Sequence, residues 1–280
     1  MPFPPIPDAP ADYNPSVGVI TPTTGDKDFG VCLASVAAQD YPNLRHYIVV
    51  DGPMHEAKVR AILGEKIWPR VTLIVLPEPT GKNGYYGYRI YGSIPIQINT
   101  DFVCYLDEDN WFNQNHVSSL VKLAGKHNLD WAYTLRNITA PDGTILFEDN
   151  CDSLGIWGSW HSQQHHIDIS CYLVKRDLAA SLAWIFNRKG YSSEHMDSDR
   201  ALCRWLLHNN PKGFTTGEYS VNYRLSGPDK RDPLGRETDS ALHFYQDGNA
   251  YMQGLYKFFP WRKATLYHLD TKTDLRRVVA

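Results

Sequence analysis

Short apolar runs and helical repeats alternate along the first part of the chain. Val17 to Ile20 is an apolar run stopped by Pro22, which predicts a short buried strand. Residues 28–39 instead carry apolar side chains at helical spacing, and Asp26 or Asp28 is placed to cap their start. The same reasoning predicts strands at 17–22, 46–51, 71–76 and 102–106 and helices at 28–39 and about 54–64. Strands that alternate with helices predict an α/β fold with a parallel sheet flanked by helices.

The second half of the chain is less regular. Helices are predicted at 115–127, 177–187 and 197–208, strands at 131–136, 167–174 and 219–225, and a hairpin turn at 141–144. Residues 226–239 are rich in Gly, Pro and charge, so they predict an exposed, mobile loop. The chain has no internal repeat and no clear domain boundary, so we expect one domain over 1–280.

Composition excludes some classes of function. The chain has 280 residues and 42% hydrophobic content, which suits an ordinary globular core. A net charge of −3 with mixed signs argues against a nucleic-acid-binding protein. Five widely spaced cysteines without a CxxC pair favour a reducing compartment over a disulfide framework or a zinc knuckle. The Pro-rich start does not resemble a signal peptide, and no apolar stretch approaches the roughly 20 residues that span a bilayer, so we expect a cytoplasmic protein.

Three acids follow directly on the apolar run that ends at Leu106. Side chains alternate along a strand, so Asp107 and Asp109 should project to the same side and Glu108 to the other. Two carboxylates held that close repel each other unless a cation lies between them. Mg²⁺ and Mn²⁺ take oxygen ligands and are often completed by substrate phosphates. The motif therefore predicts a metal that holds a diphosphate, and the alternative is an acidic turn after a strand.

Ligands in parallel sheets bind beyond the carboxyl ends of the strands. In this chain those ends carry residues 21–23, Asp51 and residues 107–109, so three polar clusters should converge on one edge. For Asp51 the alternative is a turn-forming role before Gly52.

Together these segments resemble a family-2 glycosyltransferase with the GT-A fold. The matching segments are Val19 to Thr23, Leu33 to Pro42, Ile48 to Asp51, Asn83 to Gly92 and Phe102 to Asp109. The resemblance implies a Rossmann-like, mostly parallel central sheet flanked by helices, with an appended smaller acceptor-side subregion. It divides the single domain into a nucleotide-sugar-binding half at about 15–110, an acceptor and catalytic half at about 111–225, and a mobile loop with a C-terminal extension at about 226–280.

The resemblance also implies roles for individual residues at the donor site. It implies that Thr21, Thr23 and Asp51 contact the nucleotide. It implies that Arg89 and Lys82 contact the diphosphate. It also implies that Asp109 and Asp107 bind a Mn²⁺ or Mg²⁺ ion, with His243 or His268 as a third ligand. An exposed arginine on a helix face is the alternative for Arg89. The sequence departs from the family pattern at Tyr88 and Ile90, and at Gly52, where a second acid is usual.

The resemblance implies that the catalytic base lies at the start of the helix predicted at 197–208. When the chain is aligned so that Ser198 takes the place of the family's usual Glu, Asp199 takes the place of the catalytic base. Asp197 is the second candidate. The alternative is structural, because an Asp at a helix start caps the helix and complements its dipole. Family-2 enzymes resemble one another in inverting the anomeric carbon while a carboxylate deprotonates the acceptor hydroxyl.

The expected partners are a nucleoside-diphosphate sugar, with UDP favoured, and a glycan, lipid-linked or small-molecule acceptor. Residues 226–239, with Lys230, Arg231 and Arg236, are the candidate lid over the diphosphate. The aromatic and cationic segment 251–263 could seat on the inner face of a membrane, or pack on its own domain or on a second copy in a homo-oligomer.

The aromatic and histidine-rich stretch 155–166 lies where the family shapes its acceptor pocket, although core packing is the alternative for Trp157 and Trp160. Zinc binding at His165 and His166 is disfavoured, because adjacent strand residues face opposite ways. The rival functions are a nucleotidyltransferase-type metal enzyme and a non-catalytic nucleotide-sugar-binding protein.

Overall fold

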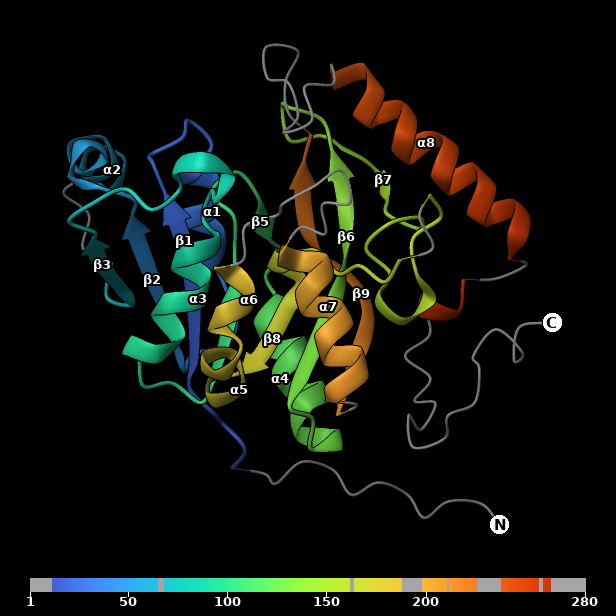
Figure 1. Cartoon of the computed structure of the whole chain (residues 1–280), viewed down its shortest axis with the longest axis horizontal. Helices are drawn as coiled ribbons and strands as arrows, with labels where there is room; N and C mark the ends of the chain where they lie inside the picture. Colours follow the sequence, from blue (N-terminus) through green and yellow to red (C-terminus); the bar gives the residue numbers. More distant parts are fainter. Residues whose placement is uncertain are drawn as a thin grey trace.

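The computed structural model describes residues 12–64, 68–161, 164–187, 198–210, 212–225, 238–256 and 259–262. These residues form one nine-stranded sheet in the order β3-β2-β1-β4-β8-β6-β9-β5, with β7 paired to β6. The strands are β1 Val17–Thr23, β2 Leu44–Val50, β3 Val71–Val75, β4 Phe102–Tyr105, β5 Trp111–Phe112, β6 Trp131–Thr139, β7 Ile145–Glu148, β8 Tyr172–Lys175 and β9 Gly213–Arg224. The predicted α/β class, with helices flanking a central sheet, is confirmed (Figure 1); the sheet is mixed, with β3, β2, β1 and β4 parallel to one another.

Helices cover the sheet. They are α1 Phe29–Ala37, α2 Glu56–Leu63, α3 Tyr88–Gln97, α4 His116–His127, α5 Arg176–Ser181, α6 Ala183–Phe186, α7 Ser198–Asn209 and α8 Thr238–Leu255. Short 3-10 turns are η1 Pro53–His55, η2 Lys82–Gly84, η3 Gly155–Trp157, η4 Ile169–Cys171 and η5 Pro260–Arg262. β1 lies between β2 and β4, is parallel to both and is buried along its whole length, which is why its sequence is a nearly unbroken apolar run.

Several elements of the second half differ from the sequence-based prediction. The expected helix at 177–187 is broken at Leu182, whose φ of −99° and ψ of 7° separate α5 from α6. The expected strand at 167–174 begins instead with η4 and becomes β8 at Tyr172. β5 was not predicted, because a two-residue strand is too short to show a period.

Helix α8 was also not predicted, and it begins inside the segment expected to be a loop. It starts at Thr238, so the loop prediction is wrong at its last two residues, while 226–237 lie outside the described residues. Tyr245 and Met252 on α8 are buried, although the helix also carries Gly248 and Gly254, which weaken a helical signal. Tertiary packing therefore outweighs local propensity here.

The C-terminal aromatic segment packs on its own domain. Trp261 is fully buried and its indole N–H donates to Asn150 Oδ1 at 2.9 Å, and its ring stacks on Phe259. Tyr251 and Leu255 remain exposed. The structure thus favours packing of this segment on its own domain. No helix in the described parts of the chain combines the length and apolar character needed to cross a bilayer, and cytoplasmic localisation stays a prediction.

Candidate functional site

The predicted polar clusters follow β1, β2 and β4, which run parallel side by side. In the register Thr23 pairs with Val50, and Ile20 pairs with Tyr105, so the three strands end at one edge of the sheet. The arrowheads of β1 and β2 point to this edge in Figure 1. The carboxyl ends of these strands thus lie together, as the sequence predicts.

Asp107 is a carboxylate held in an unfavourable environment. Tyr91 donates its hydroxyl to Asp107 Oδ1 at 2.7 Å, and the Asp107 N–H donates to Ser170 Oγ at 3.4 Å. Burial raises the pKa of Asp107 to about 8, and the charges of Asp168 and Asp109 add to that increase. The ionised form of Asp107 is therefore disfavoured until positive charge is supplied nearby.

A divalent cation held by two protein carboxylates is compatible with this environment. Mg²⁺ and Mn²⁺ in nucleotide sites are commonly held by one or two carboxylates together with substrate phosphates and waters. Asp107 and Asp109 could supply these ligands, and a cation would offset both the burial and the neighbouring negative charges that raise the pKa of Asp107.

The third ligand predicted from the resemblance, His243, stays a prediction. Among the residues that the structure describes, no group of three or more Asp, Glu, His or Cys side chains is arranged to hold a metal. His243 is exposed on α8, two residues before the buried Tyr245, so the helical turn directs it away from the core. Figure 1 shows α8 on the opposite side of the molecule from β3 and α2. His268 lies outside the described residues.

The raised pKa of Asp107 predicts a pH-dependent response to metal. Mn²⁺ must displace the proton that Asp107 holds below a pH of about 8, so metal affinity should increase as pH rises from 6 to 8. We expect the thermal shift caused by 1 mM Mn²⁺ to grow over this range in wild type and to be absent in Asp107→Asn. The experiment uses roughly millimolar metal, a level suited to weak carboxylate sites. An equal shift at pH 6 and pH 8 would contradict the prediction.

Thr21 does not face the site. Its hydroxyl hydrogen-bonds to His46 Nε2 at 2.9 Å inside the sheet, and both side chains are buried. Burial lowers the pKa of His46 to about 3, so the imidazole is neutral. The present contact of Thr21 is thus inside the sheet, and its nucleotide contact stays a prediction.

Thr23 reaches Glu108 rather than open solvent. Its hydroxyl donates to Glu108 Oε2 at 2.6 Å and accepts the Gly25 N–H at 2.9 Å. Glu108 thus points to the loop between β1 and α1, whereas Asp107 points to Tyr91 on α3. The different directions of Glu108 and Asp107 agree with the strand alternation predicted from the sequence.

Asp51 holds the segment that leads to η2. Its carboxylate accepts the N–H of Thr80 at 2.6 Å, the hydroxyl of Thr80 at 2.9 Å and the N–H of Gly81 at 3.0 Å. With 8% of its surface exposed, Asp51 is mostly committed to this loop. The present contacts of Asp51 thus fit the alternative of a structural role in the loop, and nucleotide contact stays a prediction.

The two candidate diphosphate cations flank the same segment. The Arg89 guanidinium lies 3.5 Å from the centre of the Tyr85 ring and donates to the Thr80 carbonyl at 3.4 Å. Lys82 is exposed in η2. Asp51 and Arg89 therefore both contact Thr80, which brings these two predicted residues together beside Lys82.

The candidate base, Asp199, lies beside the candidate metal site. It is in the first turn of α7, is 9% exposed, and accepts the Ile169 N–H at 3.3 Å through Oδ2. The next residue, Ser170, accepts the Asp107 N–H, so η4 contacts the carboxylate of Asp199 and the main chain of Asp107. Burial raises the pKa of Tyr91, and the charges of Asp107 and Asp199 both add to that increase, which places Tyr91 near both. Asp197 lies outside the described residues.

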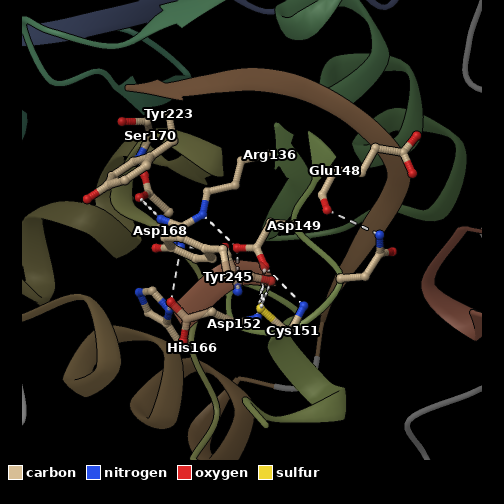
Figure 2. Close-up of polar contacts among 12 residues, drawn as sticks. Arg136, Glu148, Asp149, Cys151, Asp152, His166, Asp168, Ser170, Tyr223 and Tyr245 are labelled. Atoms are coloured by element: carbon tan, nitrogen blue, oxygen red, sulfur yellow. Dashed lines mark hydrogen bonds and ion pairs between the residues drawn. The ribbon is translucent and has the colours of Figure 1, made fainter. Parts of the chain in front are cut away.

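A buried ionic network behind this site was not predicted. Arg136 on β6 forms ion pairs with Asp149 at 2.8 Å, with Asp152 at 3.0 Å and with Asp168, as Figure 2 shows. It also donates to the Tyr245 hydroxyl at 2.9 Å. Arg136 was detectable as the charged residue within an otherwise uncharged strand, but its partners, up to 109 positions away, were not.

Asp168 connects this network to the site. One of its oxygens pairs with Arg136, and the other accepts the Ser170 N–H at 2.9 Å at the start of η4. Asp152 also pairs with His166 at 3.0 Å. Burial opposes ionisation of Asp152, but the opposite charges of His166 and Arg136 outweigh it and hold its pKa below the usual range.

The described aromatic and histidine side chains of the stretch 155–166 have packing or hydrogen-bond partners within the domain. His166 contacts Asp152, while His165 contacts the Gly155 carbonyl at 2.9 Å, so the two histidines have different partners. The Trp157 ring meets Trp261 edge-on, and Trp160 packs on Phe244. The core alternative thus accounts for both tryptophans.

The amino-acid sequence of this chain is similar to the sequences of glycosyltransferases. Residues 19–148 match the family model described as glycosyl transferase family 2. An N-acetylglucosaminyltransferase of Rhizobium meliloti (strain 1021) is 47% identical over 111 residues, which are 38% of this chain and 25% of that protein. The chain therefore spans about a quarter of the length of this curated relative.

Two solved structures share the fold. S. aureus TarS 1-349 in complex with UDP-GlcNAc has a TM-score of 0.54 at 15% identity, over 80% of this chain and 61% of that one. The mannosyltransferase PcManGT from Pyrobaculum calidifontis, in complex with GDP-Man and Mn²⁺, has a TM-score of 0.52 at 15% identity, over 81% and 62%. These similarities confirm the predicted GT-A fold.

Proposed function

Because residues 19–148 match the family model described as glycosyl transferase family 2, we propose that the chain is a metal-dependent, inverting glycosyltransferase of this family. It would move a sugar from a nucleoside-diphosphate sugar to a hydroxyl of a glycan, lipid-linked or small-molecule acceptor. The observation that carries the proposal is the position of η4, whose consecutive residues Ile169 and Ser170 contact Asp199 and Asp107. A candidate base and a candidate metal ligand thus lie at one place.

A UDP-sugar is the donor that we favour. The curated relative is an N-acetylglucosaminyltransferase, and one structural neighbour was solved with UDP-GlcNAc. The other neighbour was solved with GDP-Man, so the fold alone does not select the base. UDP-GlcNAc is therefore the first donor to test, and GDP-Man is the second.

The proposed reaction is a single displacement in which Asp199 takes the proton of the attacking acceptor hydroxyl. A positioned general base contributes roughly 10²- to 10⁴-fold to such a reaction. Asp107 and Asp109 would hold Mn²⁺ or Mg²⁺, and such an ion supplies positive charge for the diphosphate leaving group. Arg89 and Lys82 would add positive charge from the η2 side. The lid proposed at 226–239 falls almost wholly outside the described residues.

A panel of ligands tests the donor site. UDP, GDP, dTDP and CMP are added to wild type, to Asp109→Ala and to the control Asp142→Ala, whose side chain is exposed in the turn after β6. We expect UDP with Mn²⁺ to raise the melting temperature of wild type and of the control, and to leave Asp109→Ala unchanged. No shift with any nucleotide, with or without metal, would contradict the proposal.

Product analysis separates the proposed function from its rivals. Incubation with UDP-GlcNAc and a panel of soluble saccharides should yield UDP and a new β-linked product, because inversion of the α-linked donor gives the β configuration. Release of pyrophosphate would indicate a nucleotidyltransferase. Metal-dependent binding without any product would favour a non-catalytic nucleotide-sugar-binding protein.

A further inference from the structure

We propose that Glu108, the acid between the two candidate metal ligands, is a positioning residue that couples nucleotide binding to metal binding. The inference rests on the proposed function, because it assumes that a nucleotide binds at the carboxyl end of β1. Glu108 itself would touch neither ligand. It would act by joining the loop after β1 to the loop after β4.

The Glu108 carboxylate is saturated by one short segment of the chain. It accepts the Thr23 hydroxyl at 2.6 Å, the Thr24 hydroxyl at 3.0 Å, the Thr24 N–H at 3.2 Å and the Asp26 N–H at 2.8 Å. Hydrogen bonds to an ionised acceptor are about twice as strong as those between neutral groups. Glu108 therefore helps to fix the backbone of residues 23–26, together with the pairing of Thr23 with Val50 of β2.

A second contact joins the same two loops from the other side. Arg224, at the end of β9, donates to the Asp109 carbonyl at 3.1 Å and forms a 3.5 Å ion pair with Asp28. The Asp28 N–H in turn donates to Asp26 Oδ1 at 3.1 Å. The β1–α1 loop and the Asp107 to Asp109 segment are thus connected through both Glu108 and Arg224.

This arrangement has a thermodynamic consequence. A nucleotide that contacts residues 23–26 would further restrict the segment that Glu108 holds, and through Glu108 the peptide units of its neighbours Asp107 and Asp109. A metal would then bind to ligands whose motion is already restricted, and the effect is reciprocal. Coupling of this kind between two sites is typically about 5- to 150-fold in affinity.

Uridine is the probe that isolates this coupling. UDP can ligate the metal through its phosphates, so UDP and Mn²⁺ would assist each other even without Glu108. Uridine has no phosphate, so any effect of Mn²⁺ on its affinity passes through the protein. Titration calorimetry of uridine with and without Mn²⁺ therefore measures the coupling, and UDP titrated in parallel reports whether the donor site exists.

The test variant is Glu108→Gln and the matched control is Asp101→Asn. Gln has the same length, but its amide nitrogen cannot accept the hydrogen bonds that Glu108 accepts. Asp101 accepts the Ser16 N–H at 2.6 Å and the Ser16 hydroxyl at 2.8 Å, so it joins the segments of β1 and β4 at the opposite end of the two strands. Both variants weaken a carboxylate contact between the same strands, but only Glu108 lies at the proposed site.

We expect Mn²⁺ to increase uridine affinity about 5-fold or more in wild type and in Asp101→Asn, and less than 2-fold in Glu108→Gln. If Glu108→Gln fails to fold, Thr24→Val, which removes one of the hydrogen bonds, should show an intermediate coupling. Wild-type coupling in Glu108→Gln, or UDP binding with Mn²⁺ but no uridine coupling in wild type, would overturn this inference and leave the proposed function intact. Absence of UDP binding in every condition would overturn both.

Discussion

Replacement of Asp199 by Asn is expected to reduce sugar transfer by about 10²- to 10⁴-fold. The amide retains an oxygen that can accept the Ile169 N–H, so the contact to η4 can persist while the ability to remove a proton is lost. UDP affinity with Mn²⁺ should change less than 3-fold, because the change removes no proposed donor contact. The measurement is UDP release and product formation from UDP-GlcNAc with the acceptor that gives the highest wild-type rate.

Two further variants separate catalysis from helix capping at Asp199. Asp177 also lies in the first turn of a helix, α5, so Asp177→Asn loses a similar interaction with the helix dipole. We expect its transfer rate to match wild type. An equal loss of activity in both variants would assign Asp199 a structural role, and loss in Asp197→Asn alone would move the base to Asp197.

Replacement of Arg136 by Met should destabilise the protein by about 3–5 kcal/mol, because it leaves buried carboxylates without their cation. Arg136 is 2% exposed and pairs with Asp149, Asp152 and Asp168. The side chain of Met fills part of the same space, so the loss is mainly electrostatic. Chemical denaturation at pH 7 measures the free energy of unfolding directly.

The control for Arg136 is Arg262→Met. Arg262 pairs with Glu148, but about half of its side chain is exposed, so its loss should cost less than about 1 kcal/mol. Similar losses in the two variants would show that the buried network contributes little.

The Arg136 network also predicts how stability depends on pH. In wild type the lowered pKa of Asp152 gives stability that is present above the unfolded pKa of Asp and is lost as pH falls below it. Without the cation, the buried carboxylates should have raised pKa values and take up protons at a milder pH. The stability difference between Arg136→Met and wild type should therefore shrink as pH is lowered from 7 to 5.

Much of the nucleotide-side architecture could be predicted from the sequence. The runs that became β1, β2, β3 and β4 are continuous in the chain, and local periodicity identifies such elements without knowledge of their neighbours. The acids at 107–109 were detectable for the same reason, since they follow directly on an apolar run. Their placement at one edge with Asp51 follows from parallel pairing.

The sequence could not show which side of an element faces the core. Thr21 lies in a strand buried on both faces, so its sequence carries no alternation that shows its direction. His243 lies on a helix whose apolar face is weakly marked, and only the burial of Tyr245 and Met252 shows which side is inward. In both cases the sequence placed the residue in the chain but not in space.

The sequence by itself determined the order of the main elements, the α/β class and the candidate chemistry of Asp107, Asp109 and Asp199, because each depends on residues that are close in the chain. Only the tertiary structure decided the partners of Arg136 and Glu108. Glu108 meets Thr23, 85 positions away, and Arg136 meets Tyr245, 109 positions away. Such contacts arise from how the strands and loops assemble, and no local pattern of hydrophobic and polar residues encodes them.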